Sequence, residues 1–420
     1  MPNNRGNLTK ALTSRGVLWL GQTCNQRCEF CYFVDRVKSD DHPEKPFMGL
    51  DKAKSICRTL VDFYGNTAVD IQGGEPTIYP SIFELVSYCR EIGLAPTLIT
   101  NALLLENYTA CERFKVAGVQ DFLVSIQGIG DIHDRLVGVP GAHQRQLSAL
   151  QNMRQLSIPF RFNTVMTKSA IAQFPAIARL TVETGARTVN FITFNPFGDQ
   201  AEKGKRGVEN VPRYSEVKPY LQAALDILAQ AGIEANVRYF PLCILDEQYR
   251  ASVYNFQQLS YDPCEWDFAS WGWTGLGSQR TKEGPLTPPV QPSTNRLMYR
   301  CKTIIKRLAA NPVFGPLLYS TYKLFTSPPA GRDVKERRYR EIARLHAQEH
   351  CHYVYGADCM KCNLKDICDG LHGDYAGVFG TTEVRPVTEG RSIHDPCHYI
   401  RHQKKVEHIM AENRGCSNFG

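Results

Sequence analysis

The stretch that decides the fold reads Gly21-Gln-Thr-Cys24-Asn-Gln-Arg-Cys28-Glu-Phe-Cys31, and it directly follows an apolar segment that predicts a strand, Val17–Leu20. Cysteines at this spacing in a loop can bind three irons of a cubane [4Fe–4S] cluster. The fourth iron then has no protein ligand and can chelate the amino and carboxylate groups of a small molecule. The same spacing would also place the cysteines on one face of a helix, as core residues. The glycine and the position after a strand favour the cluster.

Short apolar strands alternate with amphipathic helices from residue 16 to residue 232. The predicted strands are Val17–Leu20, Ala68–Gln72, Pro96–Thr100, Asp121–Ser125, Phe160–Val165 and Thr188–Phe194. The predicted helices are Asp51–Phe63, Ile82–Glu91, Cys111–Ala117, Arg145–Arg154, Ala170–Thr184 and Ser215–Gln230, and five are followed by Gly65, Gly93, Gly118, Gly185 and Gly232. Parallel strands joined by right-handed crossovers form one sheet wrapped by helices. The pattern therefore predicts an α/β fold, a partial (β/α)6 TIM-like barrel, with a further strand at Asn236–Phe240.

Polar residues collect where these strands end. Gly73-Gly74-Glu75-Pro76 follows the second strand, Asn101 follows the third, and Ser125 and Asn163 lie on the fourth and fifth. The carboxyl ends of parallel strands carry the chemistry in βα folds. We therefore expect the site at this end of the barrel, although any of these polar residues could instead cap a strand end.

The two stretches together resemble the radical S-adenosylmethionine (SAM) superfamily, in Cys24, Cys28 and Cys31 with Phe30 before the last cysteine, and in the Gly-Gly-Glu-Pro run. The resemblance implies that SAM ligates the open iron of a [4Fe–4S] cluster and is cleaved by one electron. The resulting 5′-deoxyadenosyl radical removes a hydrogen atom from a substrate C–H bond. It also implies an electron donor such as a flavodoxin or ferredoxin, and a reducing, cytoplasmic setting.

The resemblance further implies which residues contact SAM. The Gly73–Gly74 backbone would approach the methionine amine, Glu75 would support that edge, and the guanidinium of Arg135 would pair with the carboxylate. Tyr32 and Phe33 would contact the adenine. The full set of implied SAM contacts is Tyr32, Phe33, Gly73, Gly74, Glu75, Pro76, Asn101, Ser125, Arg135 and Asn163.

A second group of cysteines lies near the C-terminus, where Cys359, Cys362 and Cys368 resemble the SPASM extension that holds auxiliary [4Fe–4S] clusters. His372 stands where that pattern has a further cysteine, so we expect one auxiliary cluster rather than two. Cys243 is the preferred fourth ligand, with Cys397, Cys351 and His372 as alternatives. A zinc site is the other interpretation of this spacing.

Composition sets the remaining limits. The 15 cysteines, without an apolar leader in the first ten residues, indicate metal binding rather than a disulfide framework. Cys57, Cys89 and Cys111 fall in helical apolar patterns, which predicts core positions. The net charge of +7 comes without a basic stripe, so we expect no nucleic acid partner and no membrane span. The basic, apolar segment Arg296–Pro328 predicts a helical insertion packed on the barrel or, alternatively, a lid or weak peripheral membrane contact.

These observations predict five regions and three functions. The regions are a tail (1–15), a radical SAM partial barrel (16–232), a bridging region with the insertion (233–350), a SPASM-like domain (351–400) and a C-terminal tail (401–420).

The favoured function is that of an enzyme acting on a small molecule, such as a sugar, nucleotide or natural-product scaffold. The reaction would be a dehydrogenation, an epimerisation or a related reaction, with Cys264 or Cys301 as hydrogen donor. The alternative is a peptide- or protein-modifying enzyme. The short stretch of only 23 residues before Cys24 counts against this alternative. A non-catalytic electron carrier or zinc-held scaffold is the third.

Overall fold

The computed structural model describes residues 13–31, 46–62, 66–196, 206–255, 265–266, scattered positions between 308 and 318, residues 351–395 and residues 398–399. Some predicted site residues lie outside this set, and their roles stay predictions. They are Tyr32, Phe33, Cys264, Cys301 and Cys397. The predicted tail 401–420 and most of the bridging region also lie outside it.

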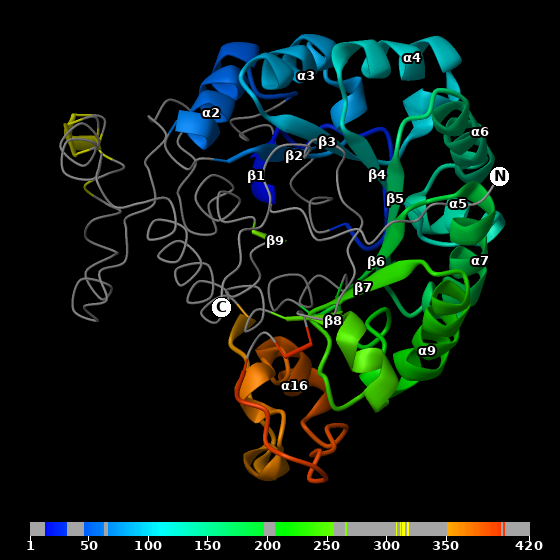
Figure 1. Cartoon of the computed structure of the whole chain (residues 1–420), viewed down its shortest axis with the longest axis vertical. Helices are drawn as coiled ribbons and strands as arrows, with labels where there is room; N and C mark the ends of the chain where they lie inside the picture. Colours follow the sequence, from blue (N-terminus) through cyan, green and yellow to red (C-terminus); the bar gives the residue numbers. More distant parts are fainter. Residues whose placement is uncertain are drawn as a thin grey trace.

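A curved parallel sheet with helices on its outer face forms most of the described chain (Figure 1). Its strand order is β8-β7-β6-β5-β4-β3-β2-β1-β9. The strands are β1 (Thr13–Trp19), β2 (Ala68–Gln72), β3 (Ala95–Thr100), β4 (Asp121–Ser125), β5 (Phe160–Met166), β6 (Thr188–Thr193), β7 (Glu234–Arg238), β8 (Val253–Tyr254) and β9 (Glu265–Trp266). The helices around them are α2 (Leu50–Asp62), α3 (Ile82–Glu91), α4 (Tyr108–Ala117), α5 (Asp131–Val137), α6 (Ala142–Gln155), α7 (Phe174–Thr184) and α9 (Tyr214–Gln230).

This arrangement confirms the predicted partial TIM-like barrel. The six predicted βα units and the seventh strand are present, and the sheet continues into the short strands β8 and β9. Helices α4, α7 and α9 are followed closely by glycines with positive φ, namely Gly118 at 91°, Gly185 at 76° and Gly232 at 68°, where the absence of a Cβ permits the left-handed turn. Helix α5 was not predicted, because seven residues are too few to show a helical period.

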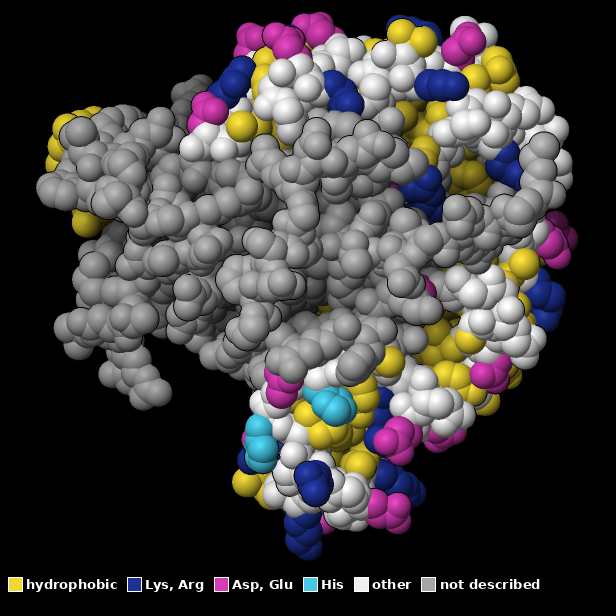
Figure 2. Space-filling model, in the orientation of Figure 1, with side chains coloured by type: hydrophobic (Ala, Val, Ile, Leu, Met, Phe, Trp, Pro, Cys, Tyr) yellow, Lys and Arg dark blue, Asp and Glu magenta, His cyan; other side chains and the backbone are white. Residues whose placement is uncertain are grey.

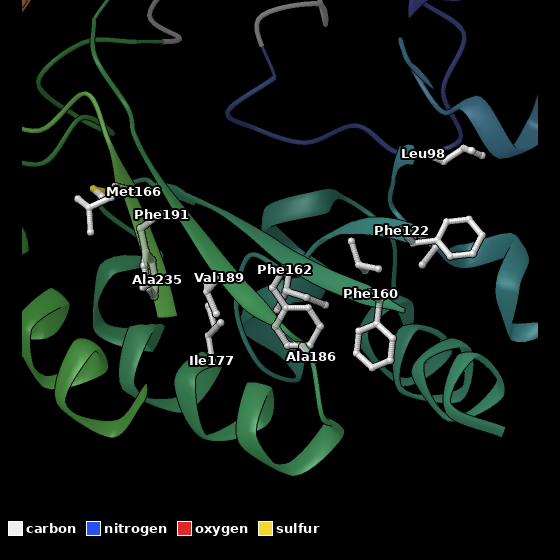
Figure 3. Packing of buried hydrophobic residues seen from close by; sticks show 14 of the residues in the cluster. Leu98, Phe122, Phe160, Phe162, Met166, Ile177, Ala186, Val189, Phe191 and Ala235 are labelled. Atoms are coloured by element: carbon white, nitrogen blue, oxygen red, sulfur yellow. The ribbon is translucent and has the colours of Figure 1, made fainter. Parts of the chain in front are cut away.

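The core lies between the sheet and the surrounding helices. Outward-facing side chains such as Phe162, Val189 and Phe191 pack against helical residues such as Ile177 (Figure 3). Removal of this apolar area from water is the main stabilising contribution, roughly 25 cal/mol per Å². The prediction that three cysteines are core residues is correct, because Cys57, Cys89 and Cys111 are all 0% exposed.

Buried ion pairs fill the inner side of the barrel near the amino ends of the strands. The Arg161 guanidinium donates to the Asp121 carboxylate, with an Nε–Oδ2 distance of 2.6 Å, and Thr97 donates to the same carboxylate. Arg15 Nη1 lies 3.4 Å from Asp70 Oδ2. Since buried charges require partners, this pairing allows the charged side chains to lie inside the barrel.

The C-terminal region forms a small module of short turns, η5 (Ala357–Lys361) and η6 (Lys365–Ile367), followed by the helix α16 (Gly373–Phe379). An antiparallel bridge between Val354 and Leu371 links its first part to the residues before α16. The module packs on the barrel beside α9 (Figure 1), where the rings of Tyr214 and Tyr375 stack.

The predictions about surface charge and about the apolar insertion can be compared with the described residues. On the face shown in Figure 2, Lys and Arg side chains over the outer helices are interspersed with Asp and Glu. Within the predicted insertion, the described residues Leu308, Phe314, Leu317 and Leu318 are helical and 40–65% exposed. None of these four is among the residues that pack on the core. Within the described residues, no helix has the length and apolarity that crossing a membrane would require.

Candidate functional site

The loop that carries Cys24, Cys28 and Cys31 leaves the carboxyl end of β1 and is held by backbone hydrogen bonds to the end of β2. The Gly74 N–H donates to the Gly21 carbonyl at 2.7 Å, and the Glu75 N–H donates to the Thr23 carbonyl at 2.9 Å. All three cysteines are free thiols of intermediate exposure. The two stretches that were singled out from the sequence are therefore one structure, in which the second supports the first.

Gly73 and Gly74 are required by the close approach of these two backbones. A Cβ on Gly74 would lie 2.0 Å from the Thr23 carbonyl oxygen, and one on Gly73 would lie 2.6 Å from that of Gly21. Contacts this short do not occur between real atoms. The sequence predicted that the glycine pair approaches the methionine amine, and its observed close neighbour is the cysteine loop itself.

Helix α5 holds the other side of the cysteine loop. The Arg27 N–H donates to the Val137 carbonyl and the Glu29 N–H donates to the Leu136 carbonyl, both at 3.0 Å. These carbonyls belong to the last turn of the helix, where they have no intrahelical partner. Arg135, predicted to contact the SAM carboxylate, lies on this same helix with an exposed side chain.

The environment of the thiols suits an iron–sulfur cluster. Burial, together with the nearby charges of Glu75 and Cys31, raises the pKa of Cys24 to about 12. Burial likewise raises the pKa of Cys28, with added contributions from Cys31 and Cys24. Three thiolates so close together are unfavourable alone, but a bound metal centre deprotonates its thiol ligands and supplies the compensating charge. The residues present therefore fit the group that their spacing predicts.

The Glu75 carboxylate joins the ends of β2 and β3, and both of its oxygens accept hydrogen bonds. Its Oε1 accepts from the Thr77 N–H at 2.9 Å and from the hydroxyls of Thr77 and Thr100 at 2.6 Å, and its Oε2 accepts from the Asn101 N–H at 2.7 Å. The side chain is 1% exposed, and burial raises its pKa. Pro76 follows as the first residue of the turn η1 (Pro76–Ile78), which Glu75 caps. Glu75 thus holds the ends of β2 and β3 together.

Asn101 connects Glu75 to the cysteine loop. Its side-chain Nδ2 donates to Asn25 Oδ1 at 2.7 Å, beside Cys24 in the chain. Its own carbonyl accepts from Gln146 Nε2 at 2.9 Å, and the same amide donates to the Ser125 carbonyl at 2.9 Å. The ends of β3 and β4 are therefore fixed relative to the loop.

A row of polar side chains continues across the inner face of the barrel. The strand register places Ser125 beside Asn163, Asn163 beside Asn190, and Asn190 beside Asn236. Neighbouring residues such as Val189 face outward into the core, so these four face inward. Asn236 Nδ2 donates to Asn190 Oδ1 at 2.9 Å, and Asn163 Oδ1 is buried without a hydrogen-bond partner. The row offers amide and hydroxyl groups to a ligand inside the barrel.

Four thiols approach one another in and beside the C-terminal module. Burial, together with the charges of Cys362 and Cys359, raises the pKa of Cys243 to about 11. Burial raises the pKa of Cys368 to about 12, with a contribution from Cys243. Backbone N–H groups point at two of the sulfurs, since Val387 N lies 3.3 Å from Cys362 Sγ and Gly370 N lies 3.4 Å from Cys368 Sγ. Donors of this kind tune the potential of iron–sulfur clusters.

The alternative ligands have other surroundings. Burial raises the pKa of Cys351 to about 12, and its charged neighbours are Asp369 and Asp374 rather than the other thiols. His372 caps α16, with its Nδ1 accepting from the Asp374 N–H at 3.2 Å. Among the described residues, no three Cys, His, Asp or Glu side chains are close enough to share a single metal ion. In a cubane each cysteine binds its own iron.

The sequence profile of the Radical SAM superfamily matches residues 20–180. This stretch contains the cysteine loop, the glycine pair that supports it, and the strand ends from β2 to β5. Residues 20–180 are therefore similar to a radical SAM domain. Similarity to this superfamily implies a [4Fe–4S] cluster and SAM as cofactors.

Curated relatives match a little under half of the chain. The AdoMet-dependent heme synthase of Oleidesulfovibrio alaskensis is 28% identical over 205 residues, which cover 48% of this chain and 51% of that protein. The PqqA peptide cyclase of Bradyrhizobium diazoefficiens is 27% identical over 183 residues, which cover 43% of this chain and 47% of that protein. The chain thus spans about half the length of these relatives. The crystal structure of Streptococcus suis SuiB aligns with a TM-score of 0.43 at 20% identity, covering 54% of this chain and 49% of that one.

Sequence reasoning missed two groups of residues around the radical SAM domain. Asn190 and Asn236 extend the polar row, and only the strand register reveals that they align with Asn163. Arg206, which contacts the cysteine loop from a segment 176 residues away, follows no recognisable pattern. A polar residue at the middle of an otherwise apolar strand was the available signal for Asn190.

Proposed function

We propose that the chain cleaves SAM reductively and uses the resulting 5′-deoxyadenosyl radical to remove a hydrogen atom from a substrate. The observation that carries this proposal is the loop with Cys24, Cys28 and Cys31, which stands at the carboxyl ends of the strands and is pressed against Gly74. These three thiols would hold the cluster, and the cluster with SAM would supply the radical chemistry. The polar row from Ser125 to Asn236 would orient the polar parts of the ligands.

The chain should contain bound iron and release 5′-deoxyadenosine. Protein reconstituted under anaerobic conditions is expected to bind about eight iron atoms per chain if two cubanes form. Incubation with SAM and dithionite should then release 5′-deoxyadenosine, measured by liquid chromatography and mass spectrometry. Cys28→Ala should abolish the release, whereas Cys111→Ala, in the core away from both thiol groups, should retain it. Release by the Cys28 variant at the wild-type rate would contradict the proposal.

For the auxiliary cluster we propose Cys243, Cys359, Cys362 and Cys368 as ligands. This set is supported by the contributions of Cys362 and Cys359 to the raised pKa of Cys243. Cys243 contributes in turn to the raised pKa of Cys368. Four thiolates would leave no open iron, which suits a centre that accepts an electron from a substrate radical. A flavodoxin or ferredoxin in a reducing compartment would supply the electron for SAM cleavage.

The favoured substrate is a small molecule, such as a sugar, a nucleotide or a natural-product scaffold. A peptide is the second candidate, because several curated relatives are PqqA peptide cyclases. The two can be separated with extract from cells grown on deuterated medium, divided by size into small-molecule and peptide fractions. Deuterium that appears in 5′-deoxyadenosine with only the small-molecule fraction supports the first candidate. Transfer with only the peptide fraction would favour the second.

A further inference from the structure

Arg206 contacts the cysteine loop next to its third cysteine. Its Nη2 donates to the Phe30 carbonyl at 3.2 Å, and its Nη1 lies 3.4 Å from the Asn195 carbonyl. The guanidinium also lies over the Phe194 ring, 4.5 Å from the ring centre. Because the Phe30 carbonyl belongs to the peptide group that carries the Cys31 N–H, the hydrogen bond from Arg206 fixes the orientation of that peptide group.

Asn195 passes this contact on to the N-terminus of α9. Its Oδ1 accepts from the Tyr214 hydroxyl at 2.7 Å. Asn195 is 7% exposed and Tyr214 is 2% exposed, so the hydrogen bond is shielded from water. Breaking it would leave a buried acceptor unpaired, which is unfavourable.

Tyr214 is joined in turn to the C-terminal module. Its ring stacks on that of Tyr375, with centres 4.0 Å apart and planes at 11°. The Tyr214 N–H donates to the Tyr375 hydroxyl at 2.9 Å, and this hydroxyl donates to Glu383. Glu383 also accepts from the Ser215 N–H at 3.1 Å. Burial raises the pKa of Tyr375, so its hydroxyl stays a donor at neutral pH.

These contacts form one continuous path between two regions that are far apart in the sequence, and its members Asn195, Tyr214 and Tyr375 are buried. It runs from Phe30 through Arg206, Asn195 and Tyr214 to Tyr375, which lies seven residues after Cys368. A displacement of the module at Tyr375 would move Tyr214 and, through Asn195 and Arg206, the peptide group of Cys31. Chains of packed and hydrogen-bonded groups of this kind can couple two sites.

We propose that Arg206, Asn195, Tyr214 and Tyr375 are positioning residues that make the SAM-binding geometry of the cysteine loop depend on the C-terminal module. The inference rests on the proposed function, because it assigns the cysteine loop to a cluster that binds SAM. It goes beyond that function by linking the two thiol groups mechanically. The link holds Cys31 in the orientation that SAM binding requires.

The test compares two tyrosine variants that each lose one hydroxyl. Tyr214→Phe removes the hydrogen bond to Asn195 and keeps the ring stack and the backbone donor. Tyr249→Phe is the matched control, because its hydroxyl donates to Asp226 at 2.7 Å on the surface, away from the path. The readout is the change in the electron paramagnetic resonance spectrum of the reduced protein when SAM is added, titrated to give a dissociation constant.

We expect Tyr214→Phe to weaken SAM binding about tenfold and to alter the spectrum of the SAM-bound protein, and Tyr249→Phe to change neither. Cys362→Ala, in the module, should weaken binding similarly in the wild type and add nothing in the Tyr214→Phe background, as coupled sites do. Equal SAM affinity and identical spectra for Tyr214→Phe and the wild type would overturn the inference. A wild-type spectrum that does not respond to SAM would instead refute the proposed function, and the inference with it.

Discussion

The cysteine loop after β1 and the thiol group of the C-terminal module differ in how they are built. The loop offers three half-buried thiols, and its shape comes from backbone contacts with the ends of β2 and α5. The module and Cys243 offer four thiols, of which Cys359 and Cys368 are buried, on short turns with N–H groups aimed at sulfur. Three thiols leave one iron of a cubane without a protein ligand, which suits a centre that must bind a further ligand. Four thiols bind every iron, which suits a centre that only exchanges electrons.

Removal of single thiols should give the largest effect, because it tests which thiols belong to the second group. Cys243→Ala should lower the iron content of reconstituted protein by about four atoms per chain, because the proposed auxiliary cluster loses a ligand. Cys351→Ala should leave the iron content unchanged, since the neighbours of Cys351 are aspartates. Iron and sulfide analysis of both variants decides whether Cys243 or Cys351 is the fourth ligand. The opposite pattern would transfer the fourth ligand position to Cys351.

The backbone contact that shapes the loop gives the next largest effect. Gly74→Ala must displace the Thr23 carbonyl, so we expect the free energy of unfolding to fall by about 1–3 kcal/mol and 5′-deoxyadenosine release to be lost. Gly49→Ala is the control, because a Cβ there meets nothing within 4 Å. Denaturant titration measures the stability of both variants. A Gly74 variant as stable and as active as the control would show that the close approach is not required.

Low pH should destabilise the barrel rather than the C-terminal module. Burial lowers the pKa of His133, on α5, from 6.5 to about 4, and its Nδ1 accepts from the Gln127 N–H at 3.2 Å. The unfolded chain therefore takes up a proton at pH 6.5 that the folded chain takes up only near pH 4. The stabilising contribution of neutral His133 is complete above pH 6.5 and falls by about 3 kcal/mol as the pH drops to about 4.

The variant that tests this pH dependence is His133→Gln. It should flatten the fall in unfolding free energy between pH 7 and pH 4, as measured by denaturant titration at several pH values. The groups of the C-terminal module with shifted pKa are cysteines and tyrosines, which stay neutral in acid. An equal pH dependence in the variant and the wild type would assign the acid sensitivity to other groups.

The smallest effect is expected within the module. Gly377 lies inside α16 with open space at its Cβ position and no positive φ. Gly377→Ala should stabilise the helix by about 0.5–1 kcal/mol, visible as a small rise in melting temperature without a change in iron content. A fall in either quantity would show that this helix tolerates less change than its open surroundings indicate.

Local patterns were enough to predict most of the barrel and the cysteine loop. Strand β2 and helix α3 begin and end where their apolar periods predict, because both are bounded by glycine or turn residues. The spacing of Cys24, Cys28 and Cys31 predicts a loop because it follows a strand end. Such features depend only on neighbours in the chain.

Features that depend on register or on distant partners could not be predicted. The contact between Gly74 and Thr23 could not be predicted, because only the fold brings the end of β2 against the loop. The contact of Gly74 with SAM stays a prediction. Asn236 reads as one polar residue in a strand until its pairing with Asn190 is known. Arg206 acts through a carbonyl 176 residues away, and backbone acceptors leave no trace in sequence.

The ion pairs between Asp121 and Arg161 and between Asp70 and Arg15 lie inside the barrel, near the amino ends of its strands. Because these charges are already paired, a ligand that displaced them would leave a buried charge without a partner, at a high cost in free energy. SAM and substrate are therefore expected to stay near the carboxyl ends of the strands, beside the cysteine loop.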